Sequence, residues 1–157
     1  MDTMKNILNR ILTIFAASTM LLAASCSKVD SVQDTELLLE VNASNLHGDW
    51  ALISVNNDFV PQGAYFYISF NRSGETFKIW NALNSIPSSY DYSEGTFKLY
   101  TDPELGVYIR GVDSVKEEWS DTYVIKKLTK DEMVWVGMND PTFIQVFIRT
   151  DKVPVQK

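Results

Sequence analysis

The chain has 157 residues and a formal net charge of −6, because 20 acidic side chains outnumber 14 basic ones. A nucleic-acid partner needs clustered Lys and Arg to neutralise phosphates, and the basic clusters here are no larger than pairs such as Lys126-Lys127. This balance argues against nucleic acid as a partner. The single cysteine also excludes an internal disulfide, so the folded domain must be stabilised by its core.

The N-terminus has the layout of a secretory signal peptide. Lys5 and Arg10 precede an uncharged run over residues 11–24. This run ends in small residues that continue to Ser25. A membrane-spanning helix needs about 20 apolar residues, so this run is short for a permanent anchor and typical of an export signal. We therefore predict a signal-peptide helix over residues 1–25 and a mature chain that begins at Cys26.

The stretch "LAASC" that ends at Cys26 resembles the bacterial lipobox. Ala23 occupies the position where that family prefers leucine, and Leu22 lies one residue earlier. The resemblance implies a lipid-modified Cys26, with palmitate among its acyl chains, and an exported lipoprotein held in the outer membrane of a Gram-negative bacterium. Each buried CH₂ of such a chain contributes about 0.8 kcal/mol to membrane binding. The membrane face stays open, and the alternative is an ordinary signal peptide followed by an unmodified cysteine.

Residues 26–45 are predicted to form a lipid-anchored tether. The first part is polar, and polar linkers of this kind are flexible. Within the tether, "TELLLEV" at residues 35–41 is apolar enough for a short helix or a short strand, and the pattern leaves both open.

From Leu46 onward, short β-type runs alternate with turn formers such as "NRSG", "TDPEL" and "TKD". Regularly spaced short strands indicate an all-β sandwich or barrel. Sequential hairpins favour a meander of eight antiparallel strands that closes on itself, because closure removes unpaired strand edges. The expected strands cover residues 49–56, 64–70, 75–81, 92–100, 106–113, 120–128, 132–138 and 143–150.

The hairpin around "NRSG" predicts which side chains face the core. Gly74 can adopt a left-handed conformation in the loop. If Phe70 and Phe77 flank the loop on the inner face, the inner positions continue by twos along both strands. Runs such as "YFYISF" and "MVWVGM" are apolar on both faces. Their outer face needs a cover, either residues 37–41 or a partner protein, unless these are the half-exposed aromatics that strands favour.

The stretch "LHGDWALISVN" resembles the entry strand of bacterial lipocalin-like lipoproteins, which share a Leu-x-Gly-x-Trp start. The stretches "ISFNRSGETFKIWN", "YSEGTFKLYTD" (with Glu94 inserted), "WSDTYVIKKLTKDEMVW" and "MNDPTFIQVFIRT" are similar to later segments of that family, in the same order. The resemblance implies a single calycin-type, up-and-down barrel over residues 46–152 and a C-terminal tail over 153–157. It also implies that Trp50 and Arg149 form a structural cation–π pair that closes one end of the barrel.

The sequence offers no catalytic constellation, so we expect a protein that is not an enzyme and that holds no cofactor or metal. His47 is the only histidine and comes just before the first strand, where a loop role is favoured. No serine lies in a sequence that resembles a nucleophile elbow.

Two binding hypotheses remain. In the first, implied by the lipocalin resemblance, the barrel mouth receives one small apolar or amphipathic ligand, although the same inward side chains could fill a solid core instead. In the second, the domain is an accessory module whose exposed Trp80 and Trp119 contact a glycan or a partner protein. The candidate ligand-lining residues of the first hypothesis are Phe66, Phe70, Phe77, Ile79, Phe97 and Trp135.

Overall fold

The computed structural model describes residues 36–83, 91–115 and 117–153, and the structural statements below concern these residues. The predicted signal peptide (1–25), the predicted anchor Cys26, the tether up to residue 35 and most of the predicted tail lie outside them. The chain divides into two units, and the second, Glu36–Lys157, contains the barrel. No helix in the described part of the chain has the length and apolar character needed to cross a bilayer.

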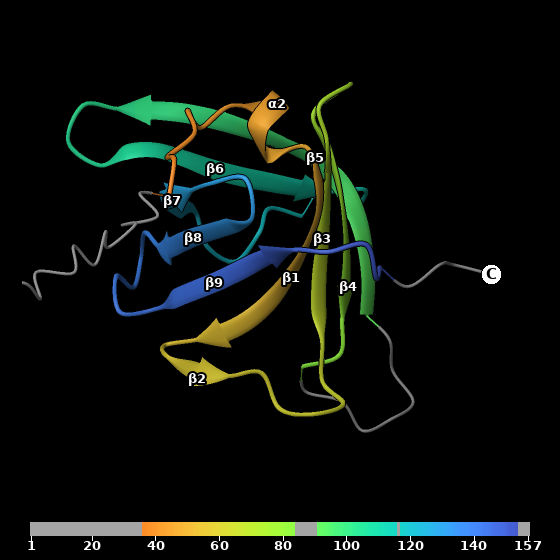
Figure 1. The fold of residues 1–157 in the computed structure, drawn as a ribbon. Coiled ribbons are helices and arrows are strands. Elements are labelled where there is room, and N and C mark those ends of the chain that lie inside the picture. Colours follow the sequence, from red (N-terminus) through yellow and green to blue (C-terminus); the bar gives the residue numbers. More distant parts are fainter. Residues whose placement is uncertain (1–35, 84–90, 116, 154–157) are drawn as a thin grey trace, which may run out of the picture. The chain divides into compact units, whose positions relative to one another are not determined.

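The described residues form one antiparallel sheet that closes into a barrel (Figure 1). Each strand from β3 to β8 pairs with the next along the chain, and β1 pairs with both β3 and β9, so the first and last long strands lie side by side. The predicted eight-stranded up-and-down barrel is confirmed. The elements are α2 (Ala43–Leu46), β1 (Gly48–Val55), β2 (Asp58–Phe59), β3 (Phe66–Asn71), β4 (Thr76–Asn81), β5 (Asp91–Asp102), β6 (Gly106–Asp113), β7 (Tyr123–Leu128), β8 (Glu132–Gly137) and β9 (Ile144–Arg149).

Two short elements were not predicted. The two-residue strand β2 pairs with the end of β1 through a tight turn in which Asn56 and Asn57 adopt φ values of 53° and 70°. Asparagine tolerates this left-handed region better than other non-glycine residues. The one-turn helix α2 is N-capped by Asn42, whose side chain accepts a hydrogen bond from the Asn45 backbone N–H at 2.9 Å. Neither element is long enough to produce a periodic sequence pattern.

The hairpin β3–β4 has the predicted register. Phe70 pairs with Phe77 and Ile68 with Ile79, and Gly74 has a φ of 82° in the connecting turn. Because side chains alternate between the two faces of a strand, these four apolar side chains project into the barrel. Burial of such a side chain contributes about 1.5–3 kcal/mol. The buried core consists of Leu46, Trp50, Leu52, Ile68, Phe70, Phe77, Phe97, Ile109, Ile125, Leu128, Met133, Trp135 and Phe147.

The end of the barrel beside α2 is closed by Trp50 and Arg149. Trp50 is fully buried, and its indole N–H donates to the Leu46 carbonyl at 2.9 Å. Arg149 pairs with Trp50 across the β1–β9 ladder, and its guanidinium lies 3.9 Å from the centroid of the Trp50 ring. Arg149 also donates to the carbonyls of Asn45 (2.6 Å), Lys130 (3.3 Å) and His47. One cation therefore ties the segment before β1 to the turn before β8.

The apolar end of the tether packs against this closed end as irregular chain, with neither a helix nor a strand over residues 37–41. The Leu39 N–H donates to the Leu128 carbonyl at 2.8 Å, and Leu39 and Val41 pack on the core. Leu37 and Leu38 instead remain 78% and 67% exposed. The segment thus covers part of the closed end and not the outer faces of the doubly apolar strands.

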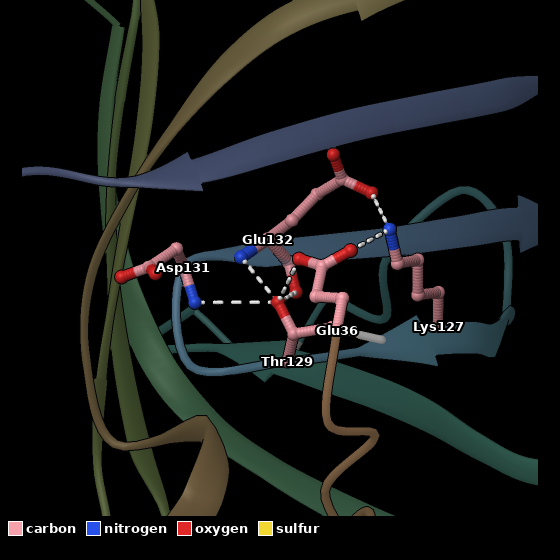
Figure 2. A network of polar contacts seen from close by, with 5 residues as sticks. All are labelled: Glu36, Lys127, Thr129, Asp131 and Glu132. Atoms are coloured by element: carbon pink, nitrogen blue, oxygen red, sulfur yellow. Dashed lines mark hydrogen bonds and ion pairs between the residues drawn. The ribbon is translucent and has the colours of Figure 1, made fainter. Parts of the chain in front are cut away.

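A polar network fastens the start of this segment to the β7–β8 hairpin (Figure 2). The Lys127 ammonium lies 2.5 Å from the Glu36 carboxylate and 2.8 Å from the Glu132 carboxylate. The Thr129 hydroxyl donates to Glu36 at 2.8 Å and accepts the N–H groups of Glu132 and Asp131 at 2.9 and 3.3 Å. Hydrogen bonds from Lys127 and then from Thr129 lower the pKa of Glu36 below its ordinary value.

We expect this network to make docking of residues 36–39 pH-dependent. Because the pKa of Glu36 is lowered in the folded state, its stabilising contribution is present above the unfolded-state pKa and is lost as the pH falls through the folded-state pKa. An NMR titration of the Glu36 side chain should give a midpoint below the ordinary glutamate value, and Lys127→Met should raise it. Lys152→Met, an exposed lysine elsewhere, is the control. Equal midpoints in all three proteins would contradict the network.

Candidate ligand-binding site

The interior of the barrel is solid toward the closed end. Phe70 and Phe97 meet edge-to-face with centroids 5.1 Å apart, and each is 1% exposed. Phe77 is equally buried. These three of the six predicted ligand-lining residues therefore fill the core and do not line a ligand cavity inside the barrel. Aromatic rings this large fill the space between tilted strands in a narrow barrel, which the inward pattern alone did not reveal.

The other three predicted residues, Phe66, Ile79 and Trp135, come together at the opposite, open end. They line a cavity of about 180 Å³. Its remaining wall consists of Trp119, Ser120, Tyr123 and Gln145, none of which was among the candidate lining residues. The cavity is thus built from β3, β4, β7, β8, β9 and the segment that precedes β7.

Trp135 forms the best-fixed wall of the cavity. Its ring stacks on Tyr123 with a centroid distance of 4.7 Å and an interplanar angle of 18°, and it meets Phe147 edge-to-face at 4.7 Å. Its indole N–H donates to the side-chain oxygen of Gln145 at 2.7 Å. Trp135 and Gln145 are 2% and 6% exposed. This bond satisfies the indole N–H and the carboxamide oxygen, as buried polar groups require.

Trp119 enters the barrel from a segment outside the regular strands. Its backbone N–H donates to the Gly111 carbonyl at 2.9 Å, and its ring lies over Gly111, where a Cβ atom would come within 2.1 Å of the indole. The ring also meets Phe77 edge-to-face at 4.9 Å. The Trp119 indole nitrogen is buried and has no hydrogen-bond partner among the described residues.

The cavity wall contains no charged side chain. Its one titratable group is the Tyr123 phenol, whose pKa is raised chiefly by burial and further by the charge of Asp121. A raised phenol pKa keeps Tyr123 neutral over the physiological range. The cavity is therefore an uncharged, aromatic space with a few neutral hydrogen-bonding groups.

A larger depression of about 460 Å³ lies between β4, β5 and β6. Its wall mixes the exposed side chains of Lys78 and Glu94 with hydroxyls such as Thr76 and Thr96, and Phe77 is its one aromatic residue. Ligand pockets are mainly apolar and aromatic with few, convergent polar groups. The smaller open-end cavity fits that description better, so we take it as the candidate site.

Trp80 and Trp119 do not form the shared exposed patch predicted for them. Trp119 lines the interior cavity. Trp80 alternates with the cavity residue Ile79 on β4 and so faces outward, where its ring lies 5.6 Å from Tyr92 and pairs across the ladder with Tyr67. The wall of the barrel separates the two tryptophans, and the accessory-module hypothesis loses the patch on which it depended.

His47, the only histidine, has a structural position. It forms the C-cap of α2, and its ring Nδ1 lies 2.9 Å from the Phe70 carbonyl oxygen. This places it at the closed end of the barrel. No group of three or more histidine, cysteine, aspartate or glutamate side chains suited to a metal ion occurs among the residues that the structure describes.

No protein-family model and no curated protein sequence matches the chain. A solved structure does: the NMR structure of a protein from Bacteroides uniformis ATCC 8492 aligns with a TM-score of 0.52 and 22% sequence identity, over 71% of this chain and 94% of that chain. At this identity the likeness shows the fold alone. It is consistent with the closed antiparallel barrel of this chain.

Proposed function

We propose that the chain is a lipocalin-like lipoprotein of the bacterial envelope whose barrel binds a small apolar or amphipathic molecule, without catalysis. The observation that carries the proposal is the division of the barrel interior. The closed end is filled and fixed by Trp50 and Arg149, whereas the open end holds an aromatic cavity. A barrel with a filled, rigid closed end and an apolar cavity at its open end is suited to reversible binding of one small molecule.

The size of the cavity limits the ligand. Typical small-molecule pockets measure about 300–1,000 Å³, and this one measures about 180 Å³. Trp119 is the part of the wall that can move, because it lies on a segment outside the strands and its buried indole N–H has no partner in the described part of the chain. An unsatisfied buried donor costs about 1–3 kcal/mol, which offsets part of the packing lost when the ring swings out. The site therefore takes a single-ring-sized molecule, or a larger one after Trp119 moves.

A matched pair of substitutions tests the binding site. Ile79→Phe places extra volume in the cavity wall, and Ile148→Phe makes the same change on a side chain that is 40% exposed on β9. Native mass spectrometry of protein isolated without refolding should show a small-molecule adduct on the wild type. We expect Ile79→Phe to reduce the adduct by at least about tenfold, which corresponds to 1.4 kcal/mol. Ile148→Phe should retain it. An adduct that survives Ile79→Phe, or none on the wild type, would refute the site.

The anchor has a separate test at Cys26. An acylated cysteine with more than one chain holds a protein on a bilayer almost irreversibly, so the full chain should fractionate with membranes and carry the lipid mass on an N-terminal peptide that starts at Cys26. We expect Cys26→Ser to move most of the protein to the soluble fraction. Ser25→Ala is the control, because it changes a neighbouring small residue and keeps the thiol. Equal membrane association of both variants would contradict the anchor.

A further inference from the structure

We propose that the open-end cavity selects a flat, uncharged molecule that carries a hydrogen-bond acceptor, and that the carboxamide NH₂ of Gln145 binds this acceptor. The inference rests on the proposed function and adds the chemical class of the ligand. It makes Gln145 the residue that determines specificity within an otherwise apolar site.

The orientation of Gln145 is fixed by its neighbour. The Trp135 indole N–H can only donate, so the atom that it contacts at 2.7 Å must be the side-chain oxygen of Gln145. The two N–H donors of the amide are left over. Among the described residues they have no hydrogen-bond partner. The amide nitrogen is also not among the fully buried unpartnered atoms, which are the indole nitrogens of Trp80 and Trp119. Since Gln145 lines the cavity, its NH₂ group is a donor available to a ligand there.

The shape and charge of the cavity restrict the rest of the ligand. Tyr123 and Trp135 lie nearly parallel, and Trp119 meets them edge-on at 6.1 and 6.0 Å. Ring faces and edges of this kind favour flat molecules. The wall has no charged side chain to pair with a ligand charge, and burying an unpaired charge is costly. The carboxylate of Asp121, which acts on Tyr123, adds repulsion toward an anion.

Four single-ring probes test the inference by NMR titration of the wild-type protein. Acetophenone has an acceptor and no charge, isopropylbenzene has nearly the same shape without the acceptor, benzoate is an anion, and trimethylphenylammonium is a cation. We expect acetophenone to bind about tenfold more tightly than isopropylbenzene, a difference of about 1.4 kcal/mol that one well-formed hydrogen bond can supply. The largest side-chain shifts should occur at the Gln145 NH₂ group. The two charged probes should bind more weakly than either neutral one.

Two variants separate the hydrogen bond from the shape of the site. Gln145→Glu at pH 8 keeps an oxygen for the Trp135 N–H and removes the NH₂ donor, and Gln145→Met removes both polar atoms at similar volume. In either variant the preference for acetophenone over isopropylbenzene should fall to about twofold or less. If isopropylbenzene binds as well as acetophenone to the wild type, or a charged probe binds best, the inference about Gln145 fails. The proposed binding of a small molecule in the open-end cavity is then unaffected. If no probe shifts the cavity residues, the proposed function fails with it.

Discussion

Replacing Trp50 with alanine is expected to lower the free energy of unfolding by about 3–5 kcal/mol, the range found for large aromatic-to-alanine changes in cores. Trp50 is fully buried, its N–H donates to Leu46, and the Arg149 guanidinium lies over its ring. Burial already lowers the pKa of Arg149, and Asp49 and Asp131 act in the opposite direction. Without the indole, this cation loses its contact with the ring and the closed end of the barrel has a cavity.

Urea denaturation followed by circular dichroism measures this loss. The matched control is Trp80→Ala, the same change on the outer surface of the wall, where the side chain is only half-buried. Most domains are stable by about 5–15 kcal/mol, so Trp50→Ala removes a large share of the total. We expect the control to cost less than half as much. Similar urea midpoints for the two variants would show that Trp50 contributes no more to stability than a tryptophan on the outer surface of the barrel.

Replacing Gly111 with alanine is expected to drive Trp119 from its position. The new Cβ atom would lie 2.1 Å from the indole and within 2.5 Å of two further ring atoms. The ring can move because it ends a side chain on a segment outside the strands, but it then loses its contact with Phe77. Forced repacking of this kind costs about 1–3 kcal/mol. The indole N–H should at the same time become open to exchange with water.

A double-mutant cycle identifies the cause. If the cost arises from the clash with Trp119, Gly111→Ala should cost less than about 0.5 kcal/mol in a Trp119→Ala background, and the coupling energy should lie within the 0.5–3 kcal/mol usual for residues in contact. Chemical denaturation of the four proteins supplies the energies, and NMR exchange of the Trp119 indole proton supplies the second measurement. Additive energies would mean that the alanine disturbs the β5–β6 ladder directly, and that Trp119 is not seated on Gly111.

The strands and their hairpins were predictable because their signals are local. Alternating apolar residues and glycine at position 74 determine the β3–β4 register without help from the rest of the chain. Closure of the barrel was predictable for a different reason, because a meander of hairpins leaves two unpaired edges unless its first and last strands meet. The resemblance to a known family around Trp50 and Arg149 predicted the pair at this junction, and the β1–β9 ladder does pair these two residues.

The division of the interior into a filled end and a cavity was not predictable from the sequence. Phe70 and Phe66 occupy equivalent inward positions four residues apart on the same side of β3, yet the first is buried in the core and the second lines the cavity. The difference depends on how far each lies along the barrel axis. Gln145 had a local signal, since in "FIQVFIR" it is a polar side chain between two inward phenylalanines, at positions 143 and 147. Its partner Trp135 lies on another strand and is identified only by the fold.

The pairing of β1 with β9 also governs the order in which the chain can fold. A ribosome releases the N-terminal strands first. The β1–β9 ladder, which pairs Trp50 with Arg149, can therefore form only after β9 has been synthesised. Until then the nascent sheet has an open flank of unpaired backbone groups, which is the kind of surface that recruits other chains. Contacts between such distant residues also slow folding. A chain that lacks β9 would therefore be expected to aggregate, however intact its earlier hairpins are.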